Sequence, residues 1–373
     1  MRSGWRKYSG LPIMASIAMV FQGCERHPSI HSLNADTTLV IEGAHRELAN
    51  SSKARVAEVI TALRMPTNPH RYALQRPVLL VDLPGNPCTF LVGDAADQAL
   101  HTYSIDGTYL GSIDGAGTDS TAFPELTSAA ATANGTIAIS DLYNRSVVVI
   151  HRSGTRRVLH LAPVYPNAPS GSQVAIGADN TLYENWFAHN VPTLSSAWPA
   201  SLPLVRAFTA EGQFLTTFGH VTPRDGKLFT AALNRGILRI QSDTAWFARR
   251  ADGRIFAYSL ARRTDEPVRE IEVPIYYRMR QPAEFVSADE KNRNVRVENH
   301  IVAFNVTSAG EFVVAVATQY PHNDDEIFRP STLIAILSRE GQITDLIDPR
   351  GQVIDMLAKG PALVAIVIRG DGR

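Results

Sequence analysis

The chain has 373 residues, 45% of them hydrophobic, which is enough apolar material for a large folded core. Its 36 Lys and Arg residues balance its 36 Asp and Glu residues, so the formal net charge is zero. Because this balance leaves no long-range field to attract a polyanion, it disfavours a nucleic-acid partner.

The N-terminus has the character of an export signal. Basic residues precede an apolar run at residues 11–21, which is too short to form a stable transmembrane helix. The run leads to Gly23-Cys24, and this junction resembles the lipobox of bacterial lipoproteins, although Phe21 and Gln22 stand where that family usually carries Leu and a small residue. The resemblance implies acylation of Cys24; an ordinary cleaved signal peptide and an uncleaved anchor are the alternatives.

The segment after Cys24 is expected to connect the membrane to the folded domain. Residues 25–36 are short and polar, as in a tether. The other cysteine is Cys88, so lipidation of Cys24 would leave no intramolecular disulfide. We therefore divide the chain into a signal at 1–24, a tether at 25–36 and a domain at 37–373 that core packing must hold together.

Within that domain, a sequence pattern of four β-rich runs joined by polar turns recurs six times. Its second run begins at Thr89, Thr136, Thr181, Thr244, Glu311 and Ala362. Successive starts lie 47, 45, 63, 67 and 51 residues apart. A period near 45 residues without helical periodicity is typical of propeller blades. The sequence predicts an all-β, six-bladed β-propeller with four-stranded antiparallel blades.

Two units carry a more specific likeness. Residues 103–113 and 139–150 contain a strand, a glycine turn and the pattern Asp-x-x-Asn-x-x-Val, with Asp141 and Asn144 as its polar pair. These segments resemble the NHL-repeat family, including six-bladed bacterial propeller lipoproteins. The resemblance covers most of the mature chain as fold but about a quarter of it as motif. In that family the pair shapes a turn, which we favour over a metal-binding or substrate-binding role.

The sixth unit is incomplete at the C-terminus. Residues 352–358 and 362–369 supply two strands, and residues 37–42 and 55–60 have the pattern of the missing third and fourth. We expect these N-terminal strands to complete the C-terminal blade and close the ring, which removes exposed sheet edges. An amphipathic helix at 48–65 is the alternative.

Long connections are expected on one face of the ring. They fall between the second and third strands of a unit or between units, whereas the other connections are short hairpins. Long loops in compact domains are often functional, so this loop-rich face is the predicted binding site. Its candidate contacts are Trp186, Phe187, His189, Trp198, Tyr276, Tyr277, Arg278, Arg280, Tyr320 and His322. Packing of the aromatic residues onto the blade tops is the structural alternative.

No local signature identifies a metal or a nucleophile. The 11 histidines show no zinc-binding spacing, and we expect no cofactor. Asp324 and Asp325 form a loop charge cluster, which we interpret as solvated in preference to the alternative that it holds a cation. Propeller lactonases bind Ca²⁺ through blade-start acids and amides, and Asp141, Glu184 and Asn185 could take such roles.

The sequence therefore predicts an exported protein, lipid-anchored in the cell envelope on the periplasmic or outer-membrane side. Its leading function is a non-enzymatic binding module for a protein, peptide or glycan. The alternative is a metal-dependent, lactonase-like hydrolase or lyase with its site in the central channel. Ligands converging from several blades would favour the enzyme, and a channel lined by small or apolar side chains would favour the binding module.

Overall fold

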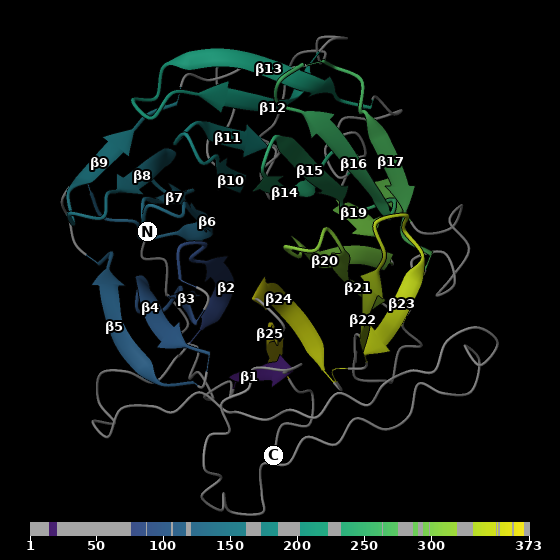
Figure 1. Ribbon diagram of the computed structural model, residues 1–373, viewed down its shortest axis with the longest axis horizontal. Helices are drawn as coiled ribbons and strands as arrows, with labels where there is room; N and C mark the ends of the chain where they lie inside the picture. The colour runs from purple at the N-terminus through teal and green to yellow at the C-terminus, as the bar shows by residue number, and fades with distance from the viewer. Residues whose placement is uncertain are drawn as a thin grey trace, which may run out of the picture.

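A computed structural model shows an all-β chain whose sheets are arranged around a central axis as a β-propeller (Figure 1). It describes residues 15–20 and most of residues 76–368. The larger gaps in that range are 117–120, 162–172, 186–201, 223–232, 275–285, 290–293 and 319–330. The described part of the chain contains no helix with the length and apolar character needed to cross a membrane.

Five sheets are four-stranded antiparallel meanders. Blade 1 comprises β2 (Pro77–Asp82), β3 (Thr89–Asp94), β4 (Ala99–Ser104) and β5 (Tyr109–Asp114). Blade 2 comprises β6 (Leu126–Ala131), β7 (Ile137–Asp141), β8 (Ser146–Ile150) and β9 (Arg156–Leu159). Blade 3 comprises β10 (Gln173–Ile176), β11 (Leu182–Asn185), β12 (Pro203–Phe208) and β13 (Phe214–His220). Blade 4 comprises β14 (Gly236–Gln241), β15 (Thr244–Arg249), β16 (Arg254–Ser259) and β17 (Arg269–Glu272). Blade 5 comprises β20 (Asn299–Val306), β21 (Phe312–Thr318), β22 (Ser331–Leu337) and β23 (Ile343–Ile347).

The sixth sheet joins the two ends of the chain. It contains β24 (Gln352–Lys359) and β25 (Ala362–Ile368), and β1 (Ala15–Val20) pairs antiparallel with β25. An N-terminal strand therefore joins the C-terminal blade, giving a ring consistent with six blades, but the sheet has three described strands rather than the expected four, and the added strand comes from the apolar run predicted to be the export signal. The segments expected in this role, 37–42 and 55–60, lie outside the described residues, as does 48–65.

The strands of a blade differ in burial, and the second strand is more buried than the innermost or the outermost one. The second strands β3 and β7 are buried along their whole length, because neighbouring blades cover both of their faces. The outermost strand β5 alternates between half-buried and exposed residues. A strand that is covered on both faces must be apolar along its whole length, as in buried sheets generally. One such apolar run recurs in each blade, and the sequence therefore shows the repeat.

Hydrophobic packing between blades holds the ring together. Six buried clusters are found among the described residues, and each one joins two neighbouring blades. The cluster between blades 1 and 6 packs Phe90 and Tyr103 against Val364 and Ile366. The described residues that blade 6 contributes to this interface come from β24 and β25, so apolar packing of these two strands joins blade 6 to blade 1.

The turns have the expected chemistry. Gly154 lies between the third and fourth strands of blade 2 with φ +84°, and its N–H donates to the carbonyl of His151 at 2.8 Å. Asn180 takes the equivalent left-handed conformation, φ +64°, in the first hairpin of blade 3. Glycine and asparagine tolerate positive φ better than other residues, so these positions were readable as turns.

The connections divide between two faces as predicted. In a meander, the first-to-second and third-to-fourth turns emerge on one face, which we call the hairpin face. The second-to-third connections and those between blades emerge on the other, which we call the loop-rich face. Its long segments include 186–202, 221–235, 273–298 and 319–330, and segment 160–172 is of similar length to the last. The third of these was expected to be a plain loop, but it contains a two-stranded hairpin, β18 (Val286–Asp289) and β19 (Asn294–Val297).

Candidate ligand-binding channel

The innermost strands of all six blades enclose a cavity of about 510 Å³ on the axis of the ring. Its walls are mainly alanine and aliphatic side chains, contributed by β2, β6, β10, β14, β20 and β24. Pro84, Ala133, Ala178 and Ser308, from the first hairpin turns, also line it, so the cavity extends toward the hairpin face. Mostly apolar walls with a few polar groups are usual in small-molecule sites, which commonly measure roughly 300–1,000 Å³.

One ion pair lies on the cavity wall where the chain ends meet. Lys359 of β24 is 4% exposed, and its ammonium bonds to the carboxylate of Asp82 on β2. The same ammonium donates to the carbonyl of Leu83 at 2.7 Å. The lysine is therefore compensated within the protein, and the pair joins blade 6 to blade 1.

Asp355 makes a second polar contact across that seam, deeper in the channel. It lies at an irregularity in the pairing of β24 with β25. Its carboxylate accepts N–H bonds from Leu80 of β2 at 2.8 Å and from Met356 at 2.9 Å. Burial raises the pKa of Asp355, and the positive charge of Arg239 opposes that increase. The carboxylate thus accepts hydrogen bonds from two backbone N–H groups, one on each side of the seam between blades 1 and 6.

Two arginines surround this single carboxylate. Arg239 of β14 lines the cavity with 26% of its side chain exposed, and its Nη2 lies 3.9 Å from Asp355 Oδ1. Arg250, directly after β15, interacts electrostatically with both Asp355 and Arg239. Desolvation lowers the pKa of each guanidinium, and because arginine starts far above neutrality, both remain charged.

A histidine and a third arginine adjoin Arg250 toward the loop-rich face. Burial lowers the pKa of His300 to about 4, with repulsion from Arg250 as the second cause, so the imidazole is neutral at pH 7. Its Nδ1 is buried and has no hydrogen-bond partner among the described residues. Burial likewise lowers the pKa of Arg235 to about 10, which still leaves it protonated.

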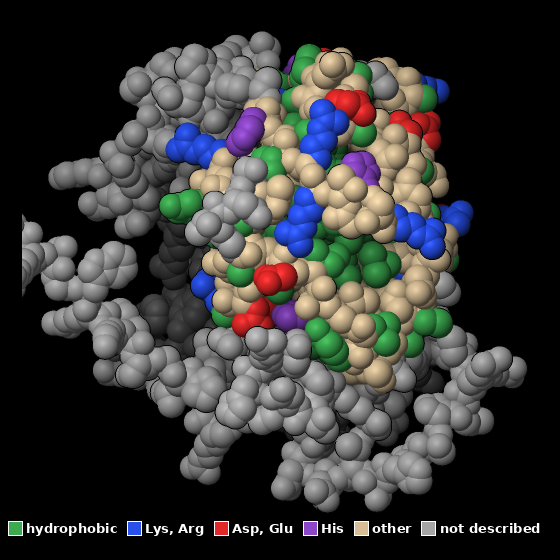
Figure 2. Space-filling view, turned by 90° about the vertical axis from the view of Figure 1, so that its left-hand side faces the viewer, with side chains coloured by type: hydrophobic (Ala, Val, Ile, Leu, Met, Phe, Trp, Pro, Cys, Tyr) green, Lys and Arg blue, Asp and Glu red, His purple; other side chains and the backbone are tan. Residues whose placement is uncertain are grey.

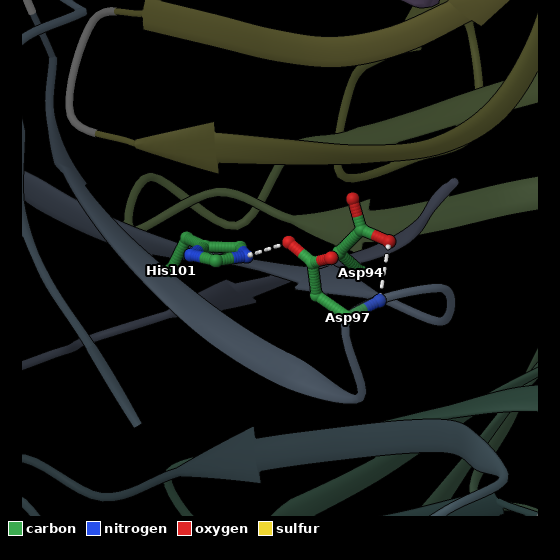
Figure 3. A group of neighbouring side chains, drawn as sticks. All are labelled: Asp94, Asp97 and His101. Atoms are coloured by element: carbon green, nitrogen blue, oxygen red, sulfur yellow. Dashed lines mark hydrogen bonds and ion pairs between the residues drawn. The ribbon is translucent and has the colours of Figure 1, made fainter. Parts of the chain in front are cut away.

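A separate group of acids lies away from the channel, at the end of β3 and the start of β4. Asp94, Asp97 and His101 bring their ligand atoms within 4.8 Å of one another (Figure 3). His101 Nε2 lies 3.5 Å from Asp97 Oδ2, and burial raises the pKa of Asp97, with the charge of Asp94 as the next cause. Asp94 is fully buried, and its carboxylate accepts N–H bonds from Arg76 at 3.1 Å and Ala96 at 2.8 Å. These bonds give Asp94 a structural role in the turn.

Asp141 repeats that arrangement in blade 2. It is fully buried, and it accepts N–H bonds from Glu125 at 3.0 Å and Tyr143 at 3.2 Å. The amide of Asn144 donates to the same carboxylate at 2.6 Å. The Asp-x-x-Asn pair therefore shapes the turn between the second and third strands, as we favoured from the sequence.

The other residues considered as Ca²⁺ ligands also have protein partners. Glu184 is fully buried and forms an ion pair with Arg206, whose guanidinium lies 5.1 Å from the centre of the Phe208 ring. The amide of Asn185 donates to the carbonyl of Leu204 at 2.9 Å. These contacts connect the second and third strands of blade 3.

The residues predicted to bind a partner all lie outside the described part of the chain. Trp186, Phe187, His189 and Trp198 fall between β11 and β12, Tyr276, Tyr277, Arg278 and Arg280 between β17 and β18, and Tyr320 and His322 between β21 and β22. Asp324, Asp325 and Cys24 are likewise outside it. Their assignment to loop-rich connections agrees with the strand order, and their contacts remain predictions.

Sequence reasoning missed the charges in the channel. The signal available was a charged residue in the middle of an otherwise mostly apolar first strand, Arg239 in GILRIQ and Asp355 in QVIDMLAK. The outer surface shows no such concentration of charge. On the outer strands of blades 1 and 2, acidic and basic side chains are scattered and form no patch of one sign (Figure 2).

The sequence matches no protein-family model and no curated protein. Solved structures similar to the chain include a candidate exported protein from Bacteroides fragilis, at 12% identity and TM-score 0.49 over 78% of each chain. Another is a member of the DUF4221 family from Bacteroides vulgatus, at 6% identity and TM-score 0.47 over 81% of this chain and 94% of that one. A streptogramin B lyase aligns at 8% identity and TM-score 0.42 over 79% and 93%. The structural neighbours are β-propeller proteins, and likenesses this distant transfer no activity.

Proposed function

We propose that this chain is an exported β-propeller that acts as a binding module in the cell envelope, anchored by Cys24 and related to the NHL-repeat proteins. Its partner is a protein, peptide or glycan bound on the loop-rich face. The observation that carries the proposal is the nature of the channel: its walls are mainly alanine and aliphatic residues, and the carboxylates of Asp82 and Asp355 already have cationic or backbone donors. A metal-dependent hydrolase would instead direct uncommitted acids into that space.

The loop-rich face offers aromatic and arginine side chains, which dominate binding energy in protein interfaces. The test uses full-length protein with a glycan array and with envelope proteins presented as purified candidates. Removing residues 186–201, or changing Trp186 and Trp198 to alanine, should weaken capture of the identified partner at least about tenfold, as expected for interface hot spots. Leu110→Ala is the control, because Leu110 is 54% exposed on the outer strand β5, away from that face. Unchanged capture by the loop variants would refute the site.

Anchoring has an independent test and a structural consequence. Cys24→Ala should abolish incorporation of labelled palmitate and release the protein from membranes. Processing at Cys24 removes β1 from the mature protein, and we propose that residues 37–42 then pair with β25. Intact-mass analysis of the mature protein decides between these arrangements: a chain that retains residues 15–20 contradicts the anchor.

A further inference from the structure

The buried charges beside the cavity do not balance. Arg239 lies 3.9 Å from Asp355 and Arg250 interacts electrostatically with both of them, while the nearby Lys359 is already compensated by Asp82. Arg239 Nη1 donates to the carbonyl of Leu238 at 3.1 Å, and its approach to Asp355 is a long 3.9 Å. No described residue accepts a hydrogen bond from the Arg250 guanidinium. Among the described residues this group, to which Arg235 adds a further cation, therefore has positive charge in excess at partly desolvated positions, which is costly unless an anion joins it.

The position of this charge relative to the apolar walls defines the shape of a ligand. Arg239 lies in the middle of β14, whereas the lining residues Gln241 and Ser242 follow it toward the hairpin face. Ala130, Ile176 and Leu357 are also among the lining residues. The arginine is thus at the inner end of a mostly apolar cavity that extends toward the hairpin face.

We propose that this cavity binds a small amphipathic anion, a molecule with one carboxylate or phosphate group and an apolar body. The acidic group pairs with Arg239 and Arg250, and the apolar body lies against the alanine and aliphatic walls. This ligand is separate from the partner of the loop-rich face, because it occupies the part of the channel that extends toward the opposite face. Guanidinium groups suit both carboxylate and phosphate, since their planar donors can bind either group with two parallel hydrogen bonds.

The test compares probes that differ only in the head group. Nonanoate and octyl phosphate carry the anion on the same eight-carbon tail, and 1-octanol is the neutral probe. Calorimetry with the purified protein should show binding of at least one anion that is about tenfold or more tighter than binding of octanol, in line with a charge-assisted hydrogen bond. Raising the sodium chloride concentration should weaken anion binding and leave octanol binding unchanged or stronger. Preference for nonanoate over octyl phosphate, or the reverse, identifies the acidic group.

The matched variants are Arg239→Met, which keeps an unbranched chain without the charge, and Arg157→Met, on the exposed outer strand β9. Arg239→Met should lose about tenfold or more in anion affinity while octanol binding persists, and Arg157→Met should match wild type. If Arg239→Met does not fold, the effect of sodium chloride on anion binding by the wild type decides whether a charged group holds the anion. Absence of anion binding, equal binding of anion and octanol, or anion binding insensitive to both salt and Arg239→Met would overturn the proposal. Deleting residues 186–201 should leave anion binding intact, so failure of the loop-face function and failure of this site are distinguishable.

Discussion

His300 should make the stability of the propeller depend on pH in a defined window. Its folded-state pKa is about 4, against 6.5 for an ordinary histidine, because burial and then repulsion from Arg250 disfavour the imidazolium. The difference of about 2.5 units corresponds to about 3 kcal/mol at 1.36 kcal/mol per unit. Above pH 6.5 both states are neutral at this residue, so it contributes no pH dependence. Between pH 6.5 and 4 only the unfolded chain binds the proton, and stability falls as the pH falls.

The measurement is the free energy of unfolding in urea for wild type and His300→Gln at a series of pH values. Other groups titrate in both proteins, so only the difference between them is informative. That difference should change by about 3 kcal/mol from pH 7.5 to pH 4, with the wild type losing more stability. Adding Arg250→Gln should reduce this pH-dependent difference in unfolding free energy, because it removes the repulsion that is the second cause of the low pKa of His300. A difference that stays constant with pH, or an NMR titration of His300 centred near pH 6.5, would refute the reasoning.

Three further changes test the structural roles assigned above. Asp141→Ala should destabilise the protein by about 2–4 kcal/mol, because buried N–H donors lose their acceptor, and added Ca²⁺ should not change the unfolding midpoint of the wild type; a calcium-dependent midpoint would restore the metal interpretation. Gly115→Ala should cost at least about 1–3 kcal/mol in thermal unfolding, since the new Cβ would lie 2.1 Å from the ring of Phe123, and a neutral result would contradict this packing. Asp82→Asn should lower the free energy of unfolding in urea more than Lys359→Met does. The first change leaves a buried ammonium beside a neutral amide, whereas water can solvate the 40%-exposed carboxylate when the lysine is lost. The reverse order would contradict the assigned burial.

The sequence predicted the blades because their signal is local. Residues such as Ile139 and Val148 are covered on both faces, so each middle strand is an apolar run bounded by turn residues. The charged centre of the channel was not predictable in this way. Arg239 and Asp355 belong to blades 4 and 6, and their proximity depends on the curvature of the ring rather than on spacing along the chain.

The role of the N-terminal apolar run could not be predicted for a different reason. The residues of β1, ASIAMV, suit both an export signal and the edge of an apolar sheet, because both need a short run of hydrophobic side chains. Composition cannot separate these uses. The predicted contacts on the loop-rich face were chosen by residue type alone, and the strand order supports only the face on which their connections emerge.

Ring closure by β24 and β25 also sets the order in which the protein can mature. The side of blade 1 that carries Phe90 and Tyr103 is covered by β24 and β25, so it stays exposed until those strands have been synthesised. Until then, the growing chain presents apolar surfaces at both open ends of the ring. Such surfaces favour aggregation, so the chain needs either delayed folding or shielding by chaperones until the ring can close.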